Sequence, residues 1–160
     1  MTSPWRCTLE TPIGRLVLSG DDRALNGVAW VEGAEGHSES CRHPLAERAC
    51  TRLSAWFADP RTPLDLPLAP SGTPYQQRAW SLLRTIPAGQ RHTYGELAER
   101  LGSAPRAVGG ACAANPLLLL IPCHRVVARQ GLGGFSAGVG REGSLALKRW
   151  LLDHESSLRS

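Results

Sequence analysis

Four prolines between residues 60 and 70 limit the fold of this chain more than any other feature of the sequence. Proline lacks the backbone N–H that a helix needs, and its ring clashes with the preceding turn, so no helix continues through this stretch. The 160 residues leave room for a small domain on each side of it. We therefore expect a linker here and two domains, at residues 1–70 and 71–160.

The two expected domains differ in charge. Residues 1–70 hold seven arginines against nine acidic residues, a net charge of −2, whereas residues 71–160 hold eleven basic and five acidic residues, a net charge of +6. A basic half beside an acidic one indicates that the second half meets a polyanion. Ordinary surface charge that keeps a protein soluble explains the same numbers, so charge alone leaves both interpretations open.

The first domain has the pattern of an antiparallel sheet with one helix. Apolar residues alternate over residues 5–11, resume at 16–18 and recur at 25–31, with turn residues between these runs. Apolar residues then recur at helical spacing over residues 45–58. This pattern predicts a small α/β domain, which we expect to be structural.

The second domain is predicted to be mostly helical. A helix is expected from Thr73 to Ile86, and Thr93 with Glu96 forms a capping box that begins a second, shorter helix. A third helix begins near Pro105, after a tight turn that contains glycine. Two short helices joined in this way form a helix-turn-helix.

The third of these helices, residues 106–114, is unusual for a helix that reads DNA. Arg106 is its only charged residue, and Gly109 and Gly110 each cost about 1 kcal/mol of helix propensity. Readout in the major groove uses Arg, Asn or Gln side chains aimed at base edges, and this helix supplies almost none. Small residues instead permit either close approach to a backbone or groove floor, or tight packing against another helix.

A cysteine beside a histidine follows this helix. The apolar run 117–121 predicts a buried extended segment that leads into Pro-Cys-His-Arg at residues 122–125. Only a thiolate is a good nucleophile, and a nearby base held by a carboxylate can generate it. Because successive side chains of an extended chain point to opposite faces, we expect a water to bridge His124 and Cys123. A Cys-His pair by itself equally describes a buried structural cysteine.

The cysteine count predicts no disulfide framework and no four-cysteine metal site. The chain has five cysteines, an odd number with no CxxC spacing, which is typical of thiols in a reducing compartment. The N-terminus lacks a signal-peptide pattern, and the longest aliphatic run is too short to cross a bilayer. We expect a soluble cytoplasmic protein without membrane contact. Four cysteines are interpreted as structural: Cys7, Cys41, Cys50 and Cys112.

The segment NPLLLLIPCHRVV (115–127) resembles the active-site signature of the O6-alkylguanine-DNA alkyltransferases, also called methylated-DNA–protein-cysteine methyltransferases. The resemblance covers residues 72–155. It includes GTPYQQRAW (72–80), IPAGQRHTYGELA (86–98), RAVGGACAANP (106–116), GGFSAG (133–138) and LALKRWLLDHE (145–155). In the first half, only TPIGRLVLSG (11–20) matches in outline.

This resemblance implies a fold and a reaction. The fold is α+β, with a small N-terminal α/β domain whose antiparallel sheet is ribonuclease-H-like, and a mostly helical C-terminal domain with a winged helix-turn-helix. The reaction is direct-reversal repair of double-stranded DNA, in which an alkyl group passes irreversibly from the O6 of a flipped-out guanine to Cys123. The thioether product does not hydrolyse, so each molecule acts once, as a monomer and without a cofactor. Repair of O4-alkylthymine and cooperative binding along DNA are left open.

The resemblance also implies residue roles. Cys123 accepts the alkyl group, His124 acts through a water as the base, and Glu155 orients His124. Asn115 holds the adjacent turn. The residues expected at the DNA are Tyr94, Arg106, Ala107, Gly109, Gly110 and Arg125, of which Arg106 fills the vacated base stack and Tyr94 presses on the 3′ phosphate. The residues expected around the flipped base are Tyr94, which also donates a proton to it, Leu118, Val127, Phe135 and Ser136.

The sequence departs from the family pattern at three places. Where some relatives bind a structural zinc, this chain has Asp21, Asp22 and Asn26, so we predict no metal. The loop between residues 135 and 145 is longer than in compact members, and Leu118 replaces a proline that lines the alkyl pocket in some relatives. Both differences bear on the size of the alkyl group rather than on the reaction.

Three alternatives compete with this interpretation. A non-catalytic lesion sensor of the same fold usually replaces the acceptor cysteine with tryptophan, whereas Cys123 is present here. A redox-sensing helix-turn-helix regulator needs base-contacting side chains that residues 106–114 hardly supply. A Cys-His hydrolase needs an oxyanion hole and turns over.

Overall fold

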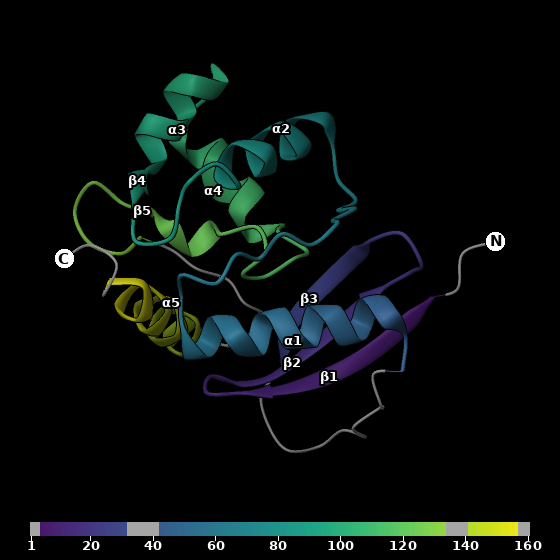
Figure 1. Cartoon of the computed structure of the whole chain (residues 1–160). Helices are drawn as coiled ribbons and strands as arrows, with labels where there is room; N and C mark the ends of the chain where they lie inside the picture. Colours follow the sequence, from purple (N-terminus) through teal and green to yellow (C-terminus); the bar gives the residue numbers. More distant parts are fainter. Residues whose placement is uncertain (1–3, 32–41, 134–140, 157–160) are drawn as a thin grey trace. The chain divides into compact units, whose positions relative to one another are not determined.

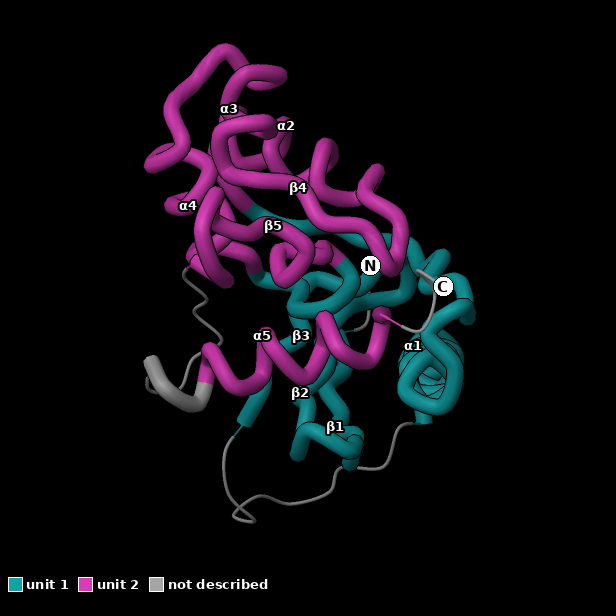
Figure 2. The backbone as a smooth tube through the Cα atoms, turned by 90° about the vertical axis from the view of Figure 1, so that its left-hand side faces the viewer, with its two compact units in different colours: residues 1–71, 116–120 teal, residues 72–115, 121–160 magenta. Residues whose placement is uncertain are grey.

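The computed structural model describes residues 4–31, 42–133 and 141–156. The chain divides into two compact units, each built from two stretches of sequence (Figure 2). Unit 1 comprises Met1–Ser71 and Pro116–Leu120, and unit 2 comprises Gly72–Asn115 and Ile121–Ser160. The chain therefore leaves unit 2 after Asn115, adds a short segment to unit 1, and returns to unit 2 at Ile121.

Unit 1 holds a three-stranded antiparallel sheet with a helix packed on one face (Figure 1). The strands follow one another in sheet order as β1 (Trp5–Thr11), β2 (Gly14–Gly20) and β3 (Leu25–Val31), and the helix is α1 (Pro44–Ala58). Burial alternates along β2, where Leu16 and Leu18 are fully buried and their neighbours are not. The expected antiparallel sheet with one helix is confirmed.

The proline-rich stretch pairs with the outer edge of β3. The N–H of Leu25 donates to the carbonyl of Pro67 at 2.9 Å, and the N–H of Ala69 donates to the carbonyl of Leu25 at 2.8 Å. Proline has no backbone N–H to donate, so a segment rich in proline suits the edge of a sheet, where it pairs on one side only. The stretch that ends the helical pattern is therefore a bound part of unit 1.

The segment 116–120 pairs with β3 further along the same strand. The N–H of Val28 donates to the carbonyl of Pro116 at 2.9 Å, and the N–H of Leu118 donates to the carbonyl of Val28 at 3.1 Å. The predicted burial of this apolar run is confirmed, but its extended conformation ends early. Leu119 has a φ of +72°, in the left-handed region, because the chain turns here before it re-enters unit 2.

Unit 2 is mainly helical. Its helices are α2 (Pro74–Leu83), α3 (Tyr94–Leu101), α4 (Pro105–Ala113) and α5 (Arg141–Ser156). A short parallel pair of strands, β4 (His92–Thr93) and β5 (Val126–Val127), and one 3-10 turn, η1 (Cys123–Arg125), complete the described part. Figure 1 shows α2, α3 and α4 gathered in one group.

The beginnings and ends of these helices follow from local chemistry. The expected capping box of Thr93 and Glu96 begins α3, and Thr73 forms a second one with Gln76 at α2. Gly102, at a φ of +63°, ends α3 in the left-handed conformation that glycine favours there. A turn of three residues then joins α3 to α4.

Trp80 belongs to the apolar core of α2, α3 and α4. Its side chain is buried, and its indole N–H donates to the carbonyl of Ala111 at 2.9 Å, which ties α2 to α4. Leu83, Leu97 and Val108 are buried on the same three helices. In the described part of the chain, no helix has the length and apolar character needed to span a membrane.

Candidate active site

Cys123 lies at the start of η1 and is held by the side chain of Asn115. The Nδ2 of Asn115 donates to the Cys123 sulfur at 3.1 Å and to the carbonyl of Ile121 at 2.8 Å. The cysteine is only 4% exposed, and this burial raises the pKa of its thiol. The hydrogen bond from Asn115 opposes the rise, as does the charge of Lys148, but neither cancels it. At rest the thiol therefore keeps its proton, and its use as a nucleophile requires a base.

The contacts of His124 define which of its ring nitrogens carries the proton. Its Nε2 lies 3.1 Å from Oε1 of Glu155, and both side chains are 1% exposed. A carboxylate only accepts, so Nε2 carries the ring proton and Nδ1 is left as an acceptor. Nδ1 is buried and has no hydrogen-bond partner among the described residues. Burial lowers the pKa of His124, and Glu155 offsets only part of this, so the imidazole is neutral and able to accept a proton.

Glu155 is held as a carboxylate by hydrogen bonds from His124 and Arg125. Burial raises its pKa, but hydrogen bonds from His124 and Arg125 outweigh burial and bring the pKa to about 2. Arg125 donates to both carboxylate oxygens through Nε and Nη2, and its Nη1 donates to the carbonyl of Ile86 at 2.6 Å. Glu155 is thus ionised at neutral pH and fixed in direction.

These contacts change the role expected for Arg125. The sequence prediction put Arg125 at the DNA, but its guanidinium is buried and engaged by Glu155 and by the carbonyl of Ile86. A planar guanidinium paired in this fork geometry positions a carboxylate. We therefore infer that Arg125 positions the carboxylate of Glu155 and does not bind a DNA phosphate.

Lys148 is the functional candidate that sequence reasoning missed. It is fully buried on α5, donates to the carbonyl of Val126 at 2.7 Å, and lies 5.7 Å from the centre of the Tyr94 ring. Burial lowers its pKa to about 8, against the opposing effect of Cys123 and Cys112. The sequence offered one sign of its importance, because Lys148 is the only lysine in a chain that otherwise uses arginine as its permanent cation.

Cys112, on α4, is chemically quieter than Cys123. Burial, with a contribution from Cys123, raises the pKa of the Cys112 thiol to about 12. A thiol with so high a pKa forms little thiolate at neutral pH. The interpretation of Cys112 as structural remains a prediction.

The surface of α4 is open where its glycines lie. A Cβ added at Gly109 or Gly110 would meet no described atom within 4 Å. Tight packing against another helix of this chain, one of the two explanations for these residues, is therefore not the reason in the described structure. Arg106 is exposed in the first turn of the same helix, and Ala107 beside it is half-buried. A partner outside the chain can approach this helix closely.

The residues expected around a flipped base are only partly described. Val127 is half-buried on β5 and pairs with Thr93, the residue before Tyr94. Gly133 packs so closely on Tyr94 that a Cβ there would come within 2.8 Å of the ring. Leu118 is buried and belongs to the segment that joins unit 1. Phe135 and Ser136 lie outside the described residues.

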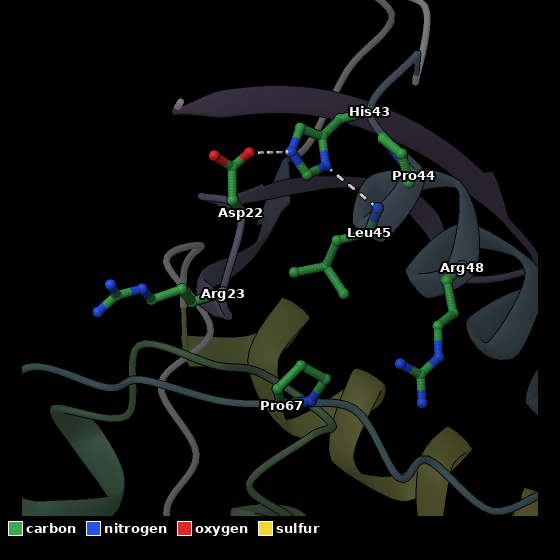
Figure 3. A pocket seen from close by; sticks show the side chains of 7 residues that line it. All are labelled: Asp22, Arg23, His43, Pro44, Leu45, Arg48 and Pro67. Carbon is green, nitrogen blue, oxygen red and sulfur yellow. Dashed lines mark hydrogen bonds and ion pairs between the residues drawn. The ribbon is translucent and has the colours of Figure 1, made fainter. Parts of the chain in front are cut away.

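The stretch in which some relatives hold zinc has other contacts here. Among the described residues, no group of three or more His, Cys, Asp or Glu side chains could hold a metal ion. Asp22 pairs with Nε2 of His43 at 2.7 Å at the edge of a pocket of about 520 Å³ in unit 1 (Figure 3). The Nδ1 of His43 accepts from the N–H of Leu45 at the start of α1. Figure 3 shows the Arg23 and Arg48 side chains on opposite sides of Leu45, with Arg23 directed away from it.

The fold and the site together define a class. A buried thiol that receives an amide hydrogen bond and is followed by a His–Glu pair has the groups that a cysteine nucleophile with its own base requires. A family model described as "6-O-methylguanine DNA methyltransferase, DNA binding domain" matches residues 74–157. The chain belongs to the family of methylated-DNA–protein-cysteine methyltransferases.

Individual relatives agree along nearly the whole chain. The methylated-DNA–protein-cysteine methyltransferase of Shigella flexneri is 38% identical and covers 94% of each chain, and that of Methanosarcina acetivorans is 37% identical over 92% of this chain and 96% of its own. The crystal structure of Mycobacterium tuberculosis O6-methylguanine methyltransferase superposes with a TM-score of 0.82, at 33% identity over 97% of this chain and 94% of that one. A structure of Mycobacterium tuberculosis OGT in complex with DNA gives a TM-score of 0.76, at 36% identity over 94% and 91%.

Proposed function

We propose that this protein repairs DNA by moving an alkyl group from the O6 of guanine to the sulfur of Cys123. The observation that carries the proposal is the arrangement of His124, which follows the buried thiol directly, binds Glu155 through Nε2 and keeps Nδ1 as an acceptor. Family membership supplies the substrate class, because the relatives are named for methylated DNA and a protein cysteine.

The proton of the thiol leaves towards His124. A water between the Cys123 sulfur and Nδ1 of His124 relays it, and the resulting imidazolium is stabilised by the ionised Glu155. Asn115 donates to the thiolate as it forms, and Lys148 adds a positive charge nearby. The charge that develops on sulfur is thus met by groups that are already in place.

The transfer itself is a displacement at the alkyl carbon. The thiolate electron pair forms the new S–C bond while the C–O6 bond breaks, and the guanine leaves as an anion that takes a proton. We assign the donation of this proton to Tyr94, whose ring centre lies 5.7 Å from the Nζ of Lys148. The product is a thioether, which water does not cleave, so one molecule repairs one lesion.

The alkylated guanine must leave the DNA duplex before this reaction. A buried thiol cannot reach an O6 inside the base stack, so the nucleotide is extruded at a cost of a few kcal/mol. We assign α3 and α4 to the DNA as a helix-turn-helix, with α4 against the minor groove. The open surface at Gly109 and Gly110 supports close approach there, and the exposed Arg106 enters the duplex to replace the lost base.

The larger organisation is part of the same proposal. We assign residues 1–70 to a ribonuclease-H-like structural domain and residues 71–160 to the DNA-binding and alkyl-acceptor domain, in which the helix-turn-helix is winged. The protein acts as a monomer in the cytoplasm. Contacts with phosphates do not depend on the base sequence of the DNA, which suits repair of lesions at any position.

Intact mass tests the reaction. The protein is incubated with an excess of duplex that carries one O6-methylguanine, and a single gain of about 14 Da without turnover is expected, because a methyl group replaces the thiol proton. Trypsin releases residues 107–125 as one peptide that holds both Cys112 and Cys123. Cys112→Ser should keep the gain in this peptide, and Cys123→Ser should lose it.

Two other results would replace the proposal. An unmodified protein that still binds the lesion tightly is a lesion sensor that retains its cysteine. An unmodified protein without preference for the lesion is a regulator of the helix-turn-helix class.

A further inference from the structure

A second pair of thiols lies in unit 1. The sulfur atoms of Cys7, on β1, and Cys50, on α1, are 3.7 Å apart, although the two residues are 43 positions apart in sequence. Cys7 faces the helix from the interior of β1, where it pairs with Leu18 of β2 and the residues before and after it are paired as well. Alkyl transfer to Cys123 uses neither of these cysteines.

We propose that Cys7 and Cys50 are a site of reversible oxidation that forms a disulfide between β1 and α1. A disulfide bond is about 2.05 Å long, so the two sulfur atoms must approach by roughly 1.7 Å. Each sulfur has to move less than an ångström, which small rotations about χ1 supply. The elements that carry the two residues already pack on each other, so the bond forms without a rearrangement of the sheet.

The two thiols differ in access, which sets the order of events. Cys7 is 1% exposed, whereas Cys50 is half-buried and is the thiol that a solute reaches first. The thiolate of Cys50 attacks a small disulfide oxidant such as oxidised glutathione, forms a mixed disulfide and releases one glutathione. Cys7 then attacks the Cys50 sulfur and releases the second glutathione. Two electrons and two protons pass from the protein thiols to the oxidant.

The consequence is a cross-link that closes a long loop. A disulfide between residues 43 positions apart restricts the unfolded chain strongly, so it stabilises the folded state of unit 1. Cys123 belongs to unit 2 and has its own partners, so alkyl transfer continues in the oxidised protein. The pair is then a modification site separate from the repair reaction.

Peptide mapping of the full-length protein tests the bond. The reduced protein is equilibrated with glutathione buffers of increasing oxidised fraction, quenched in acid, alkylated and digested with trypsin. Cys7 falls in the peptide 7–15, Cys50 in 49–52 and Cys41 in 24–42. We expect one cross-linked species that joins 7–15 to 49–52. Persistent alkylation of both cysteines, a lasting mixed disulfide on Cys50, or a cross-link to 24–42 would each overturn the proposal.

Variants and melting temperature provide the second readout. Oxidation should raise the Tm of the wild-type protein by at least about 4 °C, and Cys50→Ser, which tolerates a polar side chain because the position is half-buried, should show no rise. Cys41→Ser is the matched control and should keep both the cross-link and the rise in Tm. An equal rise in Cys50→Ser contradicts the assignment. So does a loss of alkyl transfer on oxidation while the peptide 107–125 remains unoxidised.

Discussion

The side-chain amide of Asn115 donates to the sulfur of Cys123 at 3.1 Å and to the carbonyl of Ile121 at 2.8 Å. One amide nitrogen thus joins the end of the α4 region to the two sides of Pro122, so the position of the sulfur depends on it. A hydrogen bond to the charged form of an acid lowers its pKa, and this bond opposes the rise that burial causes in Cys123.

Replacing Asn115 by alanine should therefore slow alkyl transfer and move it to higher pH. A hydrogen bond to a charged group contributes about 1.5–3 kcal/mol, which corresponds to a rate loss of about 10- to 100-fold. The single-turnover rate on a duplex with O6-methylguanine is measured across pH. Asn26→Ala removes an exposed asparagine of β3 and should leave the profile unchanged. An Asn115→Ala profile with the wild-type midpoint contradicts this role.

Glu155 should make the protein sensitive to acid. Its pKa is lowered from the ordinary 4.5 to about 2 in the folded state, so the stability it contributes is complete above about pH 4.5 and is lost as the pH falls towards 2. The loss amounts to roughly 3 kcal/mol. Urea unfolding at a series of pH values measures it.

In Glu155→Gln this acid dependence should flatten, whereas Glu99→Gln on the exposed face of α3 should keep it. Glu155→Gln also leaves the charge of Arg125 buried without a carboxylate, so its stability at neutral pH falls as well. Binding to the lesion should survive, and transfer should slow by about 10- to 100-fold because the imidazolium loses its counter-charge. Unchanged transfer kinetics would remove Glu155 from the proton path.

Lys148→Met should slow transfer because the thiolate loses a nearby cation. Methionine fills a similar volume without charge, and the missing charge raises the thiol pKa, since Lys148 lowers it in the native protein. We expect a loss of about tenfold at neutral pH that is partly regained in alkaline buffer. Arg149→Met, at the exposed neighbouring position, is the control. Equal rates in both variants at every pH would exclude Lys148 from the reaction.

Arg106→Ala should affect alkyl transfer from duplex DNA much more than alkyl transfer from the free base. If Arg106 fills the vacated stack, its removal weakens repair in duplex DNA by about tenfold or more and hardly affects reaction with free O6-alkylguanine. Arg100→Ala, an exposed arginine of α3, should affect the two substrates alike. Equal losses on both substrates in Arg106→Ala would refute the intercalating role.

Local signals in the sequence explain why much of the fold was predictable. The capping box of Thr93 and Glu96 and the proline at the start of α4 act within one turn of a helix, so their sequence spacing is their structural spacing. The alternation in β2 likewise needs only the two-residue period of a strand.

The missed features depend on contacts between distant residues. The sequence around Arg125 predicts a cation that binds DNA, because nothing nearby in the sequence shows that the guanidinium pairs with Glu155, 30 positions later. Lys148 contacts Val126 from 22 positions away, and no pattern in the sequence of α5 marks it as buried. The 3-10 turn at Cys123 replaced the expected extended backbone for a similar reason, because the preceding segment is bound to β3 and must turn before the cysteine.

Gly110→Ala should raise stability and weaken DNA binding at the same time. Alanine is favoured over glycine inside a helix by about 1 kcal/mol, and the added Cβ meets no described atom within 4 Å, so the folded protein gains stability. If α4 lies against a groove, the same methyl group enters the space that the DNA occupies. Unfolding by urea and binding to a lesion duplex, measured on one preparation, give the two quantities. Gly95→Ala on α3, where the nearest atom would lie at 3.9 Å, should gain similar stability and keep full binding. Stronger or unchanged binding in Gly110→Ala would mean that the open face of α4 does not contact DNA.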